Sequence, residues 1–330
     1  MTAVREDRDH ARKSLAGRRI AWWVALVALI AIAVPVSARA TGYEAGPLAM
    51  LVAFMPWVTL LCAVPLVFAC FARSWLLAAM AVALTVVCVA WQIPLFSGGE
   101  EGKASLTVAS VNLRFGEADP VAVVDLVADN DIDVLALTEL TPEALAALAD
   151  AGLSTELPYV EASAEPGFSG TGLWSRYPLS DAAELTGFLS QQLRASIATP
   201  RGDVTVFVVH PRAPRGSDHH VWDRELAMLY DVLAEADGPV IVAGDFNTTR
   251  DHASFRAIES LGYADAADQS GSGFAPTFPV GRGLFPPIVI DHVLERDAGL
   301  VALSAHTFAI AKADHKALVA EYGTAATASG

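Results

Sequence analysis

The sequence has few cysteines and few basic residues, and both shortages are most marked in its C-terminal part. Its three cysteines, Cys62, Cys70 and Cys88, all precede residue 100. Residues 100–330 therefore cannot depend on disulfide bonds, and a segment of that length can bury a stable core without them. From Ser97 onward the chain has 14 Lys and Arg against 33 Asp and Glu, a formal charge of −19. Such a surface repels polyanions, which argues against a protein that binds nucleic acid backbones non-specifically.

Charge is almost absent between residues 20 and 99. Three uncharged apolar runs occupy this region: Ile20–Ala38, Ala45–Ala72 and Ser74–Gly99. A helix needs roughly 20 apolar residues to cross a bilayer, and tryptophans near the ends of the runs are typical of membrane interfaces. Three such runs in succession predict three transmembrane helices rather than buried helices of a soluble protein. The sequence thus divides into a basic N-terminus (1–19), a membrane domain (20–99) and a further domain (100–330).

The distribution of basic residues predicts the side of the membrane on which each segment lies. Six of them precede the first run and Arg73 lies in the second loop, whereas Arg39 in the first loop is balanced by Glu44. The positive-inside rule then places the N-terminus in the cytoplasm and residues 100–330 outside. Alternatively, the first run is a signal peptide cleaved near Ala38-Arg39-Ala40. The two remaining helices would still leave the C-terminal domain outside.

Strand and helix patterns alternate along residues 100–330. Alternating or continuous apolar runs predict strands at 106–111, 134–137, 172–175, 204–209, 240–243, 288–294 and 317–320. Helical spacing predicts helices at 120–130, 141–149, 223–236 and 253–261. This alternation without internal repeats is typical of an α/β layered sandwich. The glycine-rich residues 97–102 are expected to form a linker.

Polar side chains follow most of the predicted strands. The full set comprises Asn112, Glu139, His210 and Asp245 with Asn247, which follow strands; Asp291 with His292, which continue the apolar residues 288–290; and Asp314 with His315, which precede the strand at 317–320. Strand ends that gather carboxylates, amides and imidazoles from distant parts of a chain commonly form the site of an α/β protein. Taken singly, each member could be a turn residue, a helix cap or a loop histidine. As an ordered set they favour one common site.

Asp245 and Asn247 follow the buried run 239–243 directly. Residues i and i+2 of a strand project to the same face, so both side chains can meet one bound group. A carboxylate beside an amide suits a metal-bound phosphate, because one group orients or deprotonates water while the other holds an oxygen.

In this order the polar residues resemble the endonuclease/exonuclease/phosphatase superfamily, which includes DNase I, abasic-site endonucleases, neutral sphingomyelinases and inositol-polyphosphate 5-phosphatases. The resemblance spans residues 104–322, and its most specific marks are Gly244–Asn247 and the pair Asp314-His315. It implies a four-layer α/β/β/α sandwich of the DNase I-like type. It also implies Mg²⁺ or Mn²⁺ as cofactor, with ligands from the set Asn112, Glu139 and Asp314.

The resemblance further implies the catalytic roles. Asp245 would activate the attacking water, and Asn247 would hold a phosphoryl oxygen. His315 would contact the scissile phosphate and Asp291 would orient it. His210 would be a phosphate contact or a general acid.

Four polar residues receive no single role. His292 receives no role, and His219 and His220 either meet the substrate or are solvated, with solvation favoured. Arg114 is either a phosphate contact or an ordinary surface arginine.

The substrate is predicted from location more than from motif. A domain tethered outside by a short linker works close to the lipid bilayer, and its acidic surface disfavours DNA. The arrangement resembles membrane-anchored actinobacterial members of the superfamily linked to teicoplanin resistance. The leading hypothesis is hydrolysis of a lipid pyrophosphate or another cell-envelope phospholipid. A membrane-anchored surface nuclease and a non-catalytic binding protein are the alternatives.

Overall fold

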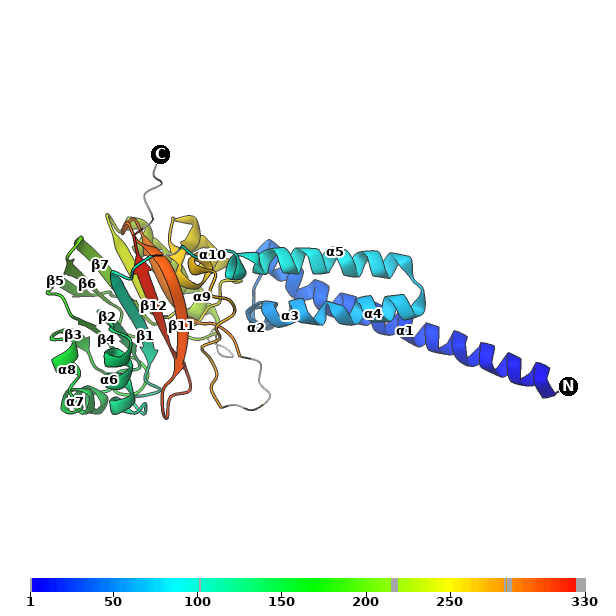
Figure 1. Cartoon of the computed structure of the whole chain (residues 1–330), viewed down its shortest axis with the longest axis horizontal. Helices are drawn as coiled ribbons and strands as arrows, with labels where there is room; N and C mark the ends of the chain where they lie inside the picture. The colour runs from blue at the N-terminus through cyan, green and yellow to red at the C-terminus, as the bar shows by residue number, and fades with distance from the viewer. Residues whose placement is uncertain (1, 101, 215–218, 282, 284–286, 325–330) are drawn as a thin grey trace. The chain divides into compact units, whose positions relative to one another are not determined.

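The computed structural model divides the chain into two compact units, Met1–Ile93 and Pro94–Gly330 (Figure 1). The residues that it describes are 2–100, 102–214, 219–281, 283 and 287–324.

The N-terminal unit is helical. Its helices are α1 (Thr2–Thr41), α2 (Pro47–Ala53), α3 (Met55–Leu61), α4 (Ala63–Ala72) and α5 (Trp75–Gln92). Within the described part of the chain, three stretches are long and apolar enough to cross a membrane: Lys13–Thr41, Met55–Ala72 and Trp75–Phe96. These agree with the three helices predicted from the sequence. Small residues such as Ala25, Ala69 and Ala81 let α1, α4 and α5 pack closely.

The described strands of the C-terminal unit form two six-stranded sheets. The first contains, in spatial order, β11 (Val301–Ala309), β12 (Lys316–Gly323), β1 (Leu106–Asn112), β2 (Val134–Thr138), β4 (Thr171–Ser175) and β3 (Tyr159–Ser163). The second contains β5 (Leu179–Glu184), β6 (Leu193–Thr199), β7 (Gly202–Val209), β8 (Val240–Asp245), β10 (Asp291–Arg296) and β9 (Ala264–Asp265). Both are mixed sheets, because β1 with β2 and β7 with β8 pair in parallel while the other neighbours are antiparallel.

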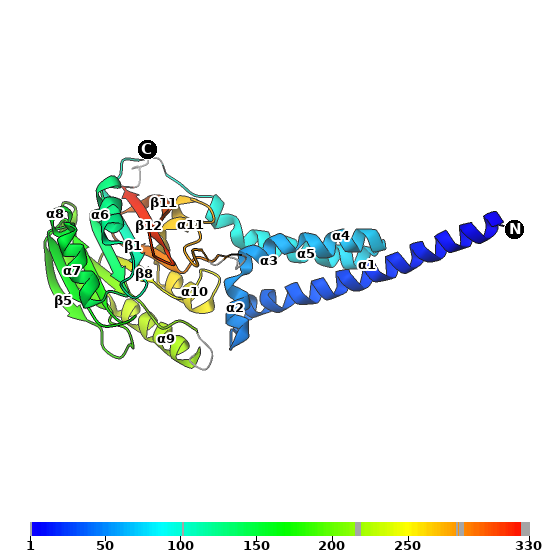
Figure 2. The same cartoon turned by 90° about the horizontal axis from the view of Figure 1, so that it is seen from below.

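Three hydrophobic clusters define four layers. One cluster lies between the sheets and includes Val108 of β1 and Val206 of β7. A second packs the outer face of the first sheet against α6 (Pro120–Asp129), α7 (Pro142–Asp150) and α8 (Leu153–Glu156). The third packs the second sheet against α9 (His219–Glu235) and α10 (Ala253–Ser260). Figure 2 shows α6 and α7 on one side of the strands and α9 and α10 on the other. The predicted α/β/β/α sandwich is confirmed.

The first two helices of the C-terminal unit, α6 and α7, begin where the sequence predicts. The side chain of Asp119 accepts a hydrogen bond from the backbone N–H of Val121, and Pro120 is the first residue of α6. Thr141 caps α7 in the same way by accepting from the N–H of Ala144.

Two expectations need correction. The strand predicted at 288–294 begins only at Asp291, because Ile288 forms an isolated bridge to Phe278 instead. Part of the expected linker is attached to the domain that follows it: the backbone N–H of Gly99 donates to the carbonyl of Gln269, next to α11 (Ala266–Ser270). A Cβ atom on Gly98 would come 2.5 Å from that same carbonyl oxygen, so only glycine permits this close approach.

Candidate active site

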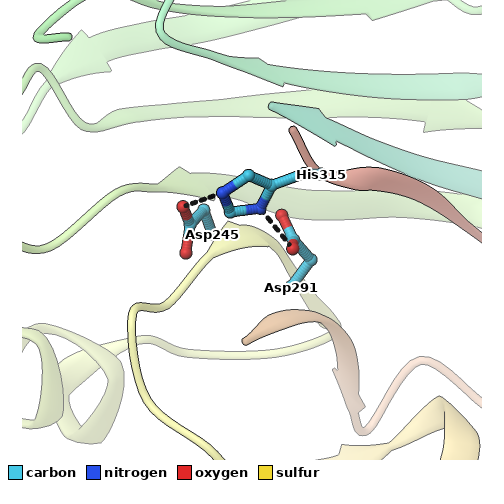
Figure 3. Close-up of side chains that lie close together, drawn as sticks. All are labelled: Asp245, Asp291 and His315. Carbon is cyan, nitrogen blue, oxygen red and sulfur yellow. Dashed lines mark hydrogen bonds and ion pairs between the residues drawn. The ribbon is translucent and has the colours of Figure 1, made fainter. Parts of the chain in front are cut away.

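The polar residues meet at one end of the core between the two sheets. On β8, Ile241 packs into this core, and strand alternation puts Asp245 on the same face. On β10, Val293 packs there and Asp291 shares its face. His315 lies directly before β12 and reaches the same point (Figure 3). Three segments that are distant in sequence thus bring two carboxylates and an imidazole together.

His315 lies between two buried carboxylates. Its Nδ1 is 2.8 Å from Oδ2 of Asp291, and its Nε2 is 3.8 Å from Oδ2 of Asp245. None of the three residues is more than 6% exposed. Burial alone lowers the pKa of an imidazole, but the charges of Asp291 and Asp245 outweigh it and raise the pKa of His315 to about 9. The ring is therefore an imidazolium at neutral pH.

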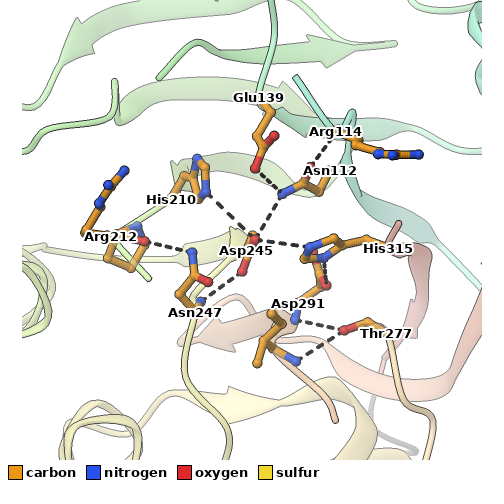
Figure 4. A network of polar contacts seen from close by, with 12 residues as sticks. Asn112, Arg114, Glu139, His210, Arg212, Asp245, Asn247, Thr277, Asp291 and His315 are labelled. Carbon is orange, nitrogen blue, oxygen red and sulfur yellow. Dashed lines mark hydrogen bonds and ion pairs between the residues drawn. The ribbon is translucent and has the colours of Figure 1, made fainter. Parts of the chain in front are cut away.

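Asp245 is the central carboxylate of the network (Figure 4). Its Oδ2 accepts a hydrogen bond from Nδ2 of Asn112 at 3.0 Å, and its Oδ1 accepts one from the backbone N–H of Asn247 at 2.9 Å. Burial, followed by the charge of Asp291, raises the pKa of Asp245 to about 7, although His315 opposes the change. A carboxyl that titrates near neutral pH is suited to accept a proton from water.

The turn after β8 differs from the extended geometry expected for Asp245 and Asn247. Asn247 has a φ of 48°, so the two side chains converge through an Asx turn and not through strand alternation. Gly244 is required before this turn, because its φ is 154° and a Cβ atom there would lie 2.0 Å from the carbonyl oxygen of Val209. Nδ2 of Asn247 donates to the carbonyl of Pro211 at 2.9 Å, which ties the turn to the loop after β7.

Asn112 and Glu139 adjoin Asp245 from the facing sheet. Nδ2 of Asn112 is 3.3 Å from Oε1 of Glu139, and Oε2 of Glu139 accepts the backbone N–H of Phe115 at 2.6 Å. Burial raises the pKa of Glu139, against the effect of these two hydrogen bonds. Arg114 and Phe115 have φ values of 49° and 54°, which are uncommon for residues with side chains. This strained backbone aims an N–H group at the carboxylate.

His210 differs from His315 in charge. Its Nε2 is 3.8 Å from Oδ2 of Asp245, and its backbone N–H donates to Oε1 of the buried Gln192 at 2.7 Å. Complete burial, and then the charge of His315, lower the pKa of His210 to about 4; the charge of Arg212 acts in the same direction. The ring is neutral at pH 7, which favours a phosphate contact over a general acid.

The structure groups the candidate metal ligands differently from the sequence prediction. Among the described residues, Asp245, Asp291 and His315 offer one ligand atom each within 4.8 Å of one another. The predicted set was Asn112, Glu139 and Asp314. Asn112 and Glu139 lie beside the Asp245 group, as given above. Asp314 is half-buried, and its backbone carbonyl accepts the N–H of Val280. Its charge raises the pKa values of both Glu139 and His315.

The donor set fits a divalent cation. Carboxylates of Glu139, Asp245, Asp291 and Asp314 gather around one imidazolium, so the site is negative on balance. In the described part of the chain, Oδ1 of Asp291 is buried without a hydrogen-bond partner. Carboxylate oxygens, such as those of Glu139 and Asp291, are the ligands that Mg²⁺ and Mn²⁺ prefer.

His292 has a structural position that the sequence did not reveal. Its Nδ1 is 2.8 Å from Oδ2 of Asp265 and its Nε2 is 3.0 Å from the carbonyl oxygen of Thr248. The ring also lies 4.3 Å from that of Phe255, measured between centroids. It thus joins β10 to the turn that follows Asn247. No local pattern could have indicated a partner 27 residues away.

Two buried side chains that support the site were also missed. Oγ1 of Thr277 accepts the backbone N–H groups of Ile290 and Asp291, each at 3.2 Å. Gln192 holds the backbone of His210, as described above. Thr277 and Gln192 follow no strand that the sequence predicts, so the strand-end rule did not find them.

His219, His220 and Arg114 differ in exposure and in partners. His219 is largely buried, contrary to the expectation, and pairs with Asp223 at 3.4 Å, whereas His220 is exposed as expected. Arg114 is a surface arginine, because its guanidinium is 3.3 Å from Oε2 of Glu117 and donates to the carbonyl of Lys312.

Comparison with known proteins agrees with the resemblance seen in the sequence. The sequence profile described as the Endonuclease/Exonuclease/phosphatase family matches residues 109–315. No curated protein matches the chain.

Solved structures share the fold. A humanized TDP2 of D. rerio is 16% identical with a TM-score of 0.56, over 66% of this chain and 99% of that one. An endonuclease/exonuclease/phosphatase from Beutenbergia cavernae is 18% identical with a TM-score of 0.56, over 67% and 72%. An AP endonuclease from Archaeoglobus fulgidus is 18% identical with a TM-score of 0.55, over 65% and 98%. At these identities the similarity establishes the fold alone.

Proposed function

Because the chain belongs to the endonuclease/exonuclease/phosphatase family, whose members hydrolyse phosphate esters, we propose that it is a divalent-metal-dependent hydrolase of a membrane-linked phosphate ester or pyrophosphate. One observation carries the catalytic part of this proposal. An imidazolium, His315, lies between two buried carboxylates, and one of these, Asp245, also contacts Asn112 of the facing sheet.

The acidity of the site makes a cation necessary. The negative charge of a phosphate group would be repelled by several carboxylates and attracted by only one imidazolium. An added positive charge is therefore needed before the phosphate can enter the site. We assign the ion to Glu139 with Asn112, assisted by Asp314. The group of Asp245, Asp291 and His315 is a poorer choice, because Nδ1 of His315 already pairs with Oδ2 of Asp291 at 2.8 Å and the proposed reaction needs Nε2 for a phosphoryl oxygen. When bound, Mg²⁺ or Mn²⁺ would polarise the phosphoryl oxygens.

The chain's own residues accept the proton and supply the other groups that stabilise the negative charge of the phosphate. Asp245 accepts a proton from the attacking water, since its pKa of about 7 allows it to do so near neutral pH. His315 donates a hydrogen bond to the charged phosphoryl oxygen, and Asp291 keeps its ring charged and oriented. Nδ2 of Asn247 has a second N–H besides the one given to Pro211, and this can bind another oxygen.

The proposed location follows from the apolar helices and the basic residues. Three stretches can span a bilayer by length and composition, and the excess of Arg and Lys before the first favours an outward-facing C-terminal unit. A lipid-linked phosphate is available at that surface. A structural relative, the D. rerio TDP2, has been solved with a single-stranded DNA product, but the charge of −19 here disfavours a nucleic acid.

The proposal is tested on the full-length protein in detergent. We expect Mg²⁺- or Mn²⁺-dependent phosphate release from farnesyl pyrophosphate or phosphatidic acid, little cleavage of plasmid DNA, and loss of activity with EDTA or in His315→Ala. Arg201→Gln is the matched control, because Arg201 is exposed and precedes β7, at the opposite end from His210. Cleavage of DNA with no release from the lipids would support the nuclease alternative. Absence of all activity, with metal binding retained, would support the non-catalytic one.

A further inference from the structure

The ring of Phe278 lies beside the imidazole of His315. The two centroids are 4.6 Å apart, and the ring planes are inclined at 41°. The backbone that carries this half-buried ring is paired with Ile288. The N–H of Phe278 donates to the carbonyl of Ile288 at 3.0 Å, and its carbonyl accepts the N–H of Ile288 at 2.6 Å. The aromatic ring is therefore presented to His315 by a hydrogen-bonded segment.

The same segment is bonded to both chain neighbours of His315. The N–H of Lys316 donates to the carbonyl of Thr277, and the N–H of Val280 donates to that of Asp314, each at 2.8 Å. The aromatic residue lies between these two attachments in the sequence. The backbones that carry the two rings are thus held side by side, which fixes where the phenylalanine ring can lie relative to the imidazole.

A second group in the C-terminal unit has almost the same arrangement. Nδ1 of His292 is 2.8 Å from Oδ2 of Asp265, and the ring of Phe255 lies 4.3 Å from that of His292 with an inclination of 42°. We call these three residues the structural trio, and the corresponding residues Asp291, His315 and Phe278 the site trio. In each trio a carboxylate engages Nδ1 and a tilted phenylalanine ring restrains the plane of the imidazole. Packing and a hydrogen bond together hold a side chain in one orientation.

The two trios differ at the other ring nitrogen. Nε2 of His292 is 3.0 Å from the carbonyl oxygen of Thr248, so this ring joins two parts of the fold. Nε2 of His315 is 3.8 Å from Oδ2 of Asp245, which is beyond hydrogen-bond distance (Figure 3). The site trio therefore holds its imidazole as firmly as the structural trio does, but directs the second nitrogen at the carboxylate that is proposed to activate water.

We propose that Phe278 is a positioning residue, whose ring holds the imidazole of His315 in the plane in which Nε2 meets the charged phosphoryl oxygen. This inference rests on the proposed function. Asp291 fixes the place of Nδ1, and the tilted aromatic ring fixes the direction in which Nε2 points. An aromatic face attracts a cation within about 6 Å of its centroid, so Phe278 also favours the charged form of the ring in this orientation.

The test measures kcat and KM separately for farnesyl pyrophosphate with Mg²⁺ at one fixed pH, using the full-length protein in detergent. Phe278→Leu keeps an apolar side chain but loses the aromatic face. It should lower kcat by about 5- to 30-fold, the factor expected for one desolvated cation–π contact. KM should change less than about 3-fold, because the aligned imidazole acts mainly in the transition state while the metal ion and Asn247 still bind the phosphate.

Two matched variants make the result specific. Phe278→Tyr keeps the aromatic face and should hold kcat within about 3-fold of wild type. Phe255→Leu makes the same change in the structural trio, and should lower the melting temperature while kcat stays within about 3-fold of wild type. Melting curves show whether each variant is folded. A merely structural role for Phe278 predicts that Phe278→Leu behaves as Phe255→Leu does.

The outcomes separate the two proposals. If wild type releases no phosphate from farnesyl pyrophosphate with Mg²⁺ or Mn²⁺, the proposed function fails and this inference fails with it. If wild type is active and Phe278→Leu keeps its kcat, only the inference is overturned. Equal losses of kcat in Phe278→Leu and Phe255→Leu would overturn it as well, because a general loosening of the unit would then explain both. So would an equal loss in Phe278→Tyr, because the aromatic face would then have no effect.

Discussion

Replacing Asp291 with Asn should move the whole pH–activity profile to lower pH. The proposed reaction needs Asp245 deprotonated and His315 protonated. Their pKa values of about 7 and about 9 predict an activity maximum between these limits. The negative charge of Asp291 raises both values, so its removal lowers both, and both limbs of the profile shift in the same direction.

The size of the shift can be estimated from His315. The pKa of its buried ring stands at about 9 against 6.5 for a free imidazole, a difference equivalent to about 3 kcal/mol in favour of the charged form. Asp291 makes the largest contribution that raises this pKa, and its carboxylate lies at hydrogen-bond distance from the ring, 2.8 Å. Its neutralisation should therefore lower the alkaline limb by on the order of 1–2 pH units.

The assay measures kcat/KM for a lipid pyrophosphate from about pH 5 to about pH 10. Wild type and Asp291→Asn are compared at one fixed Mg²⁺ concentration, so that the effect of the ion is the same for both. The acid limb of Asp291→Asn should also move down, and activity at pH 8 should fall more than activity at pH 6. Arg201→Gln should keep the wild-type profile. Unchanged limbs with a uniformly lower rate would refute the reasoning, because Asp291 would then act through shape and not through charge.

The same ring makes the stability of the fold depend on pH. A histidine whose pKa is raised on folding binds its proton more tightly in the folded state. His315 therefore contributes stability that is fully present below about pH 6.5 and is lost as the pH rises through about 9. Melting temperatures of wild type should decrease across this window, and those of Asp291→Asn should decrease less.

Three further substitutions test other contacts. Asp245→Asn should abolish hydrolysis yet raise the melting temperature above pH 7, because a carboxyl whose pKa is raised to about 7 by burial destabilises the fold when ionised; a lower melting temperature would contradict this. His292→Leu should destabilise the fold by about 3–5 kcal/mol in urea unfolding, since it leaves Asp265 buried without its partner, and a loss below about 1 kcal/mol would show that the pair is dispensable. Gly244→Ala should remove activity through displacement of β8, because the added Cβ would lie 2.0 Å from the carbonyl oxygen of Val209; wild-type kcat/KM would disprove this strain.

The sequence predicts most of the fold because the buried strands are continuous apolar runs. Runs 134–137 and 240–243 lie within β2 and β8, and both are fully buried. β5 and β11 were missed for the opposite reason. The exposed and half-buried residues of β5, Leu179–Glu184, include polar and charged side chains, so no run marks it. Its position is fixed by pairing with β6, which a local pattern cannot show.

The candidate site was predicted as a set of residues but not as a geometry. Strand ends located Asn112 and Asp245 correctly, because they are the last residues of β1 and β8. Asp291 joins them because β10 runs antiparallel to β8 and therefore begins where β8 ends. The order of strands, however, decides which side chains touch. The contact of Asn112 with Asp245 joins residues 133 positions apart on facing sheets. The sequence alone could not distinguish this pairing from a contact between Asn112 and Asp314.

His210 and His315 show why charge states also require the structure. Both are histidines at the end of the core between the sheets, and burial alone lowers the pKa of each. Only His315 has a carboxylate at 2.8 Å, and this contact reverses the effect of burial. Once His315 is charged, it lowers the pKa of His210 further. Burial, together with the charge of His315, thus keeps the ring of His210 neutral. The site can therefore present a fixed positive charge and a neutral hydrogen-bonding ring to the same phosphate between about pH 4 and about pH 9.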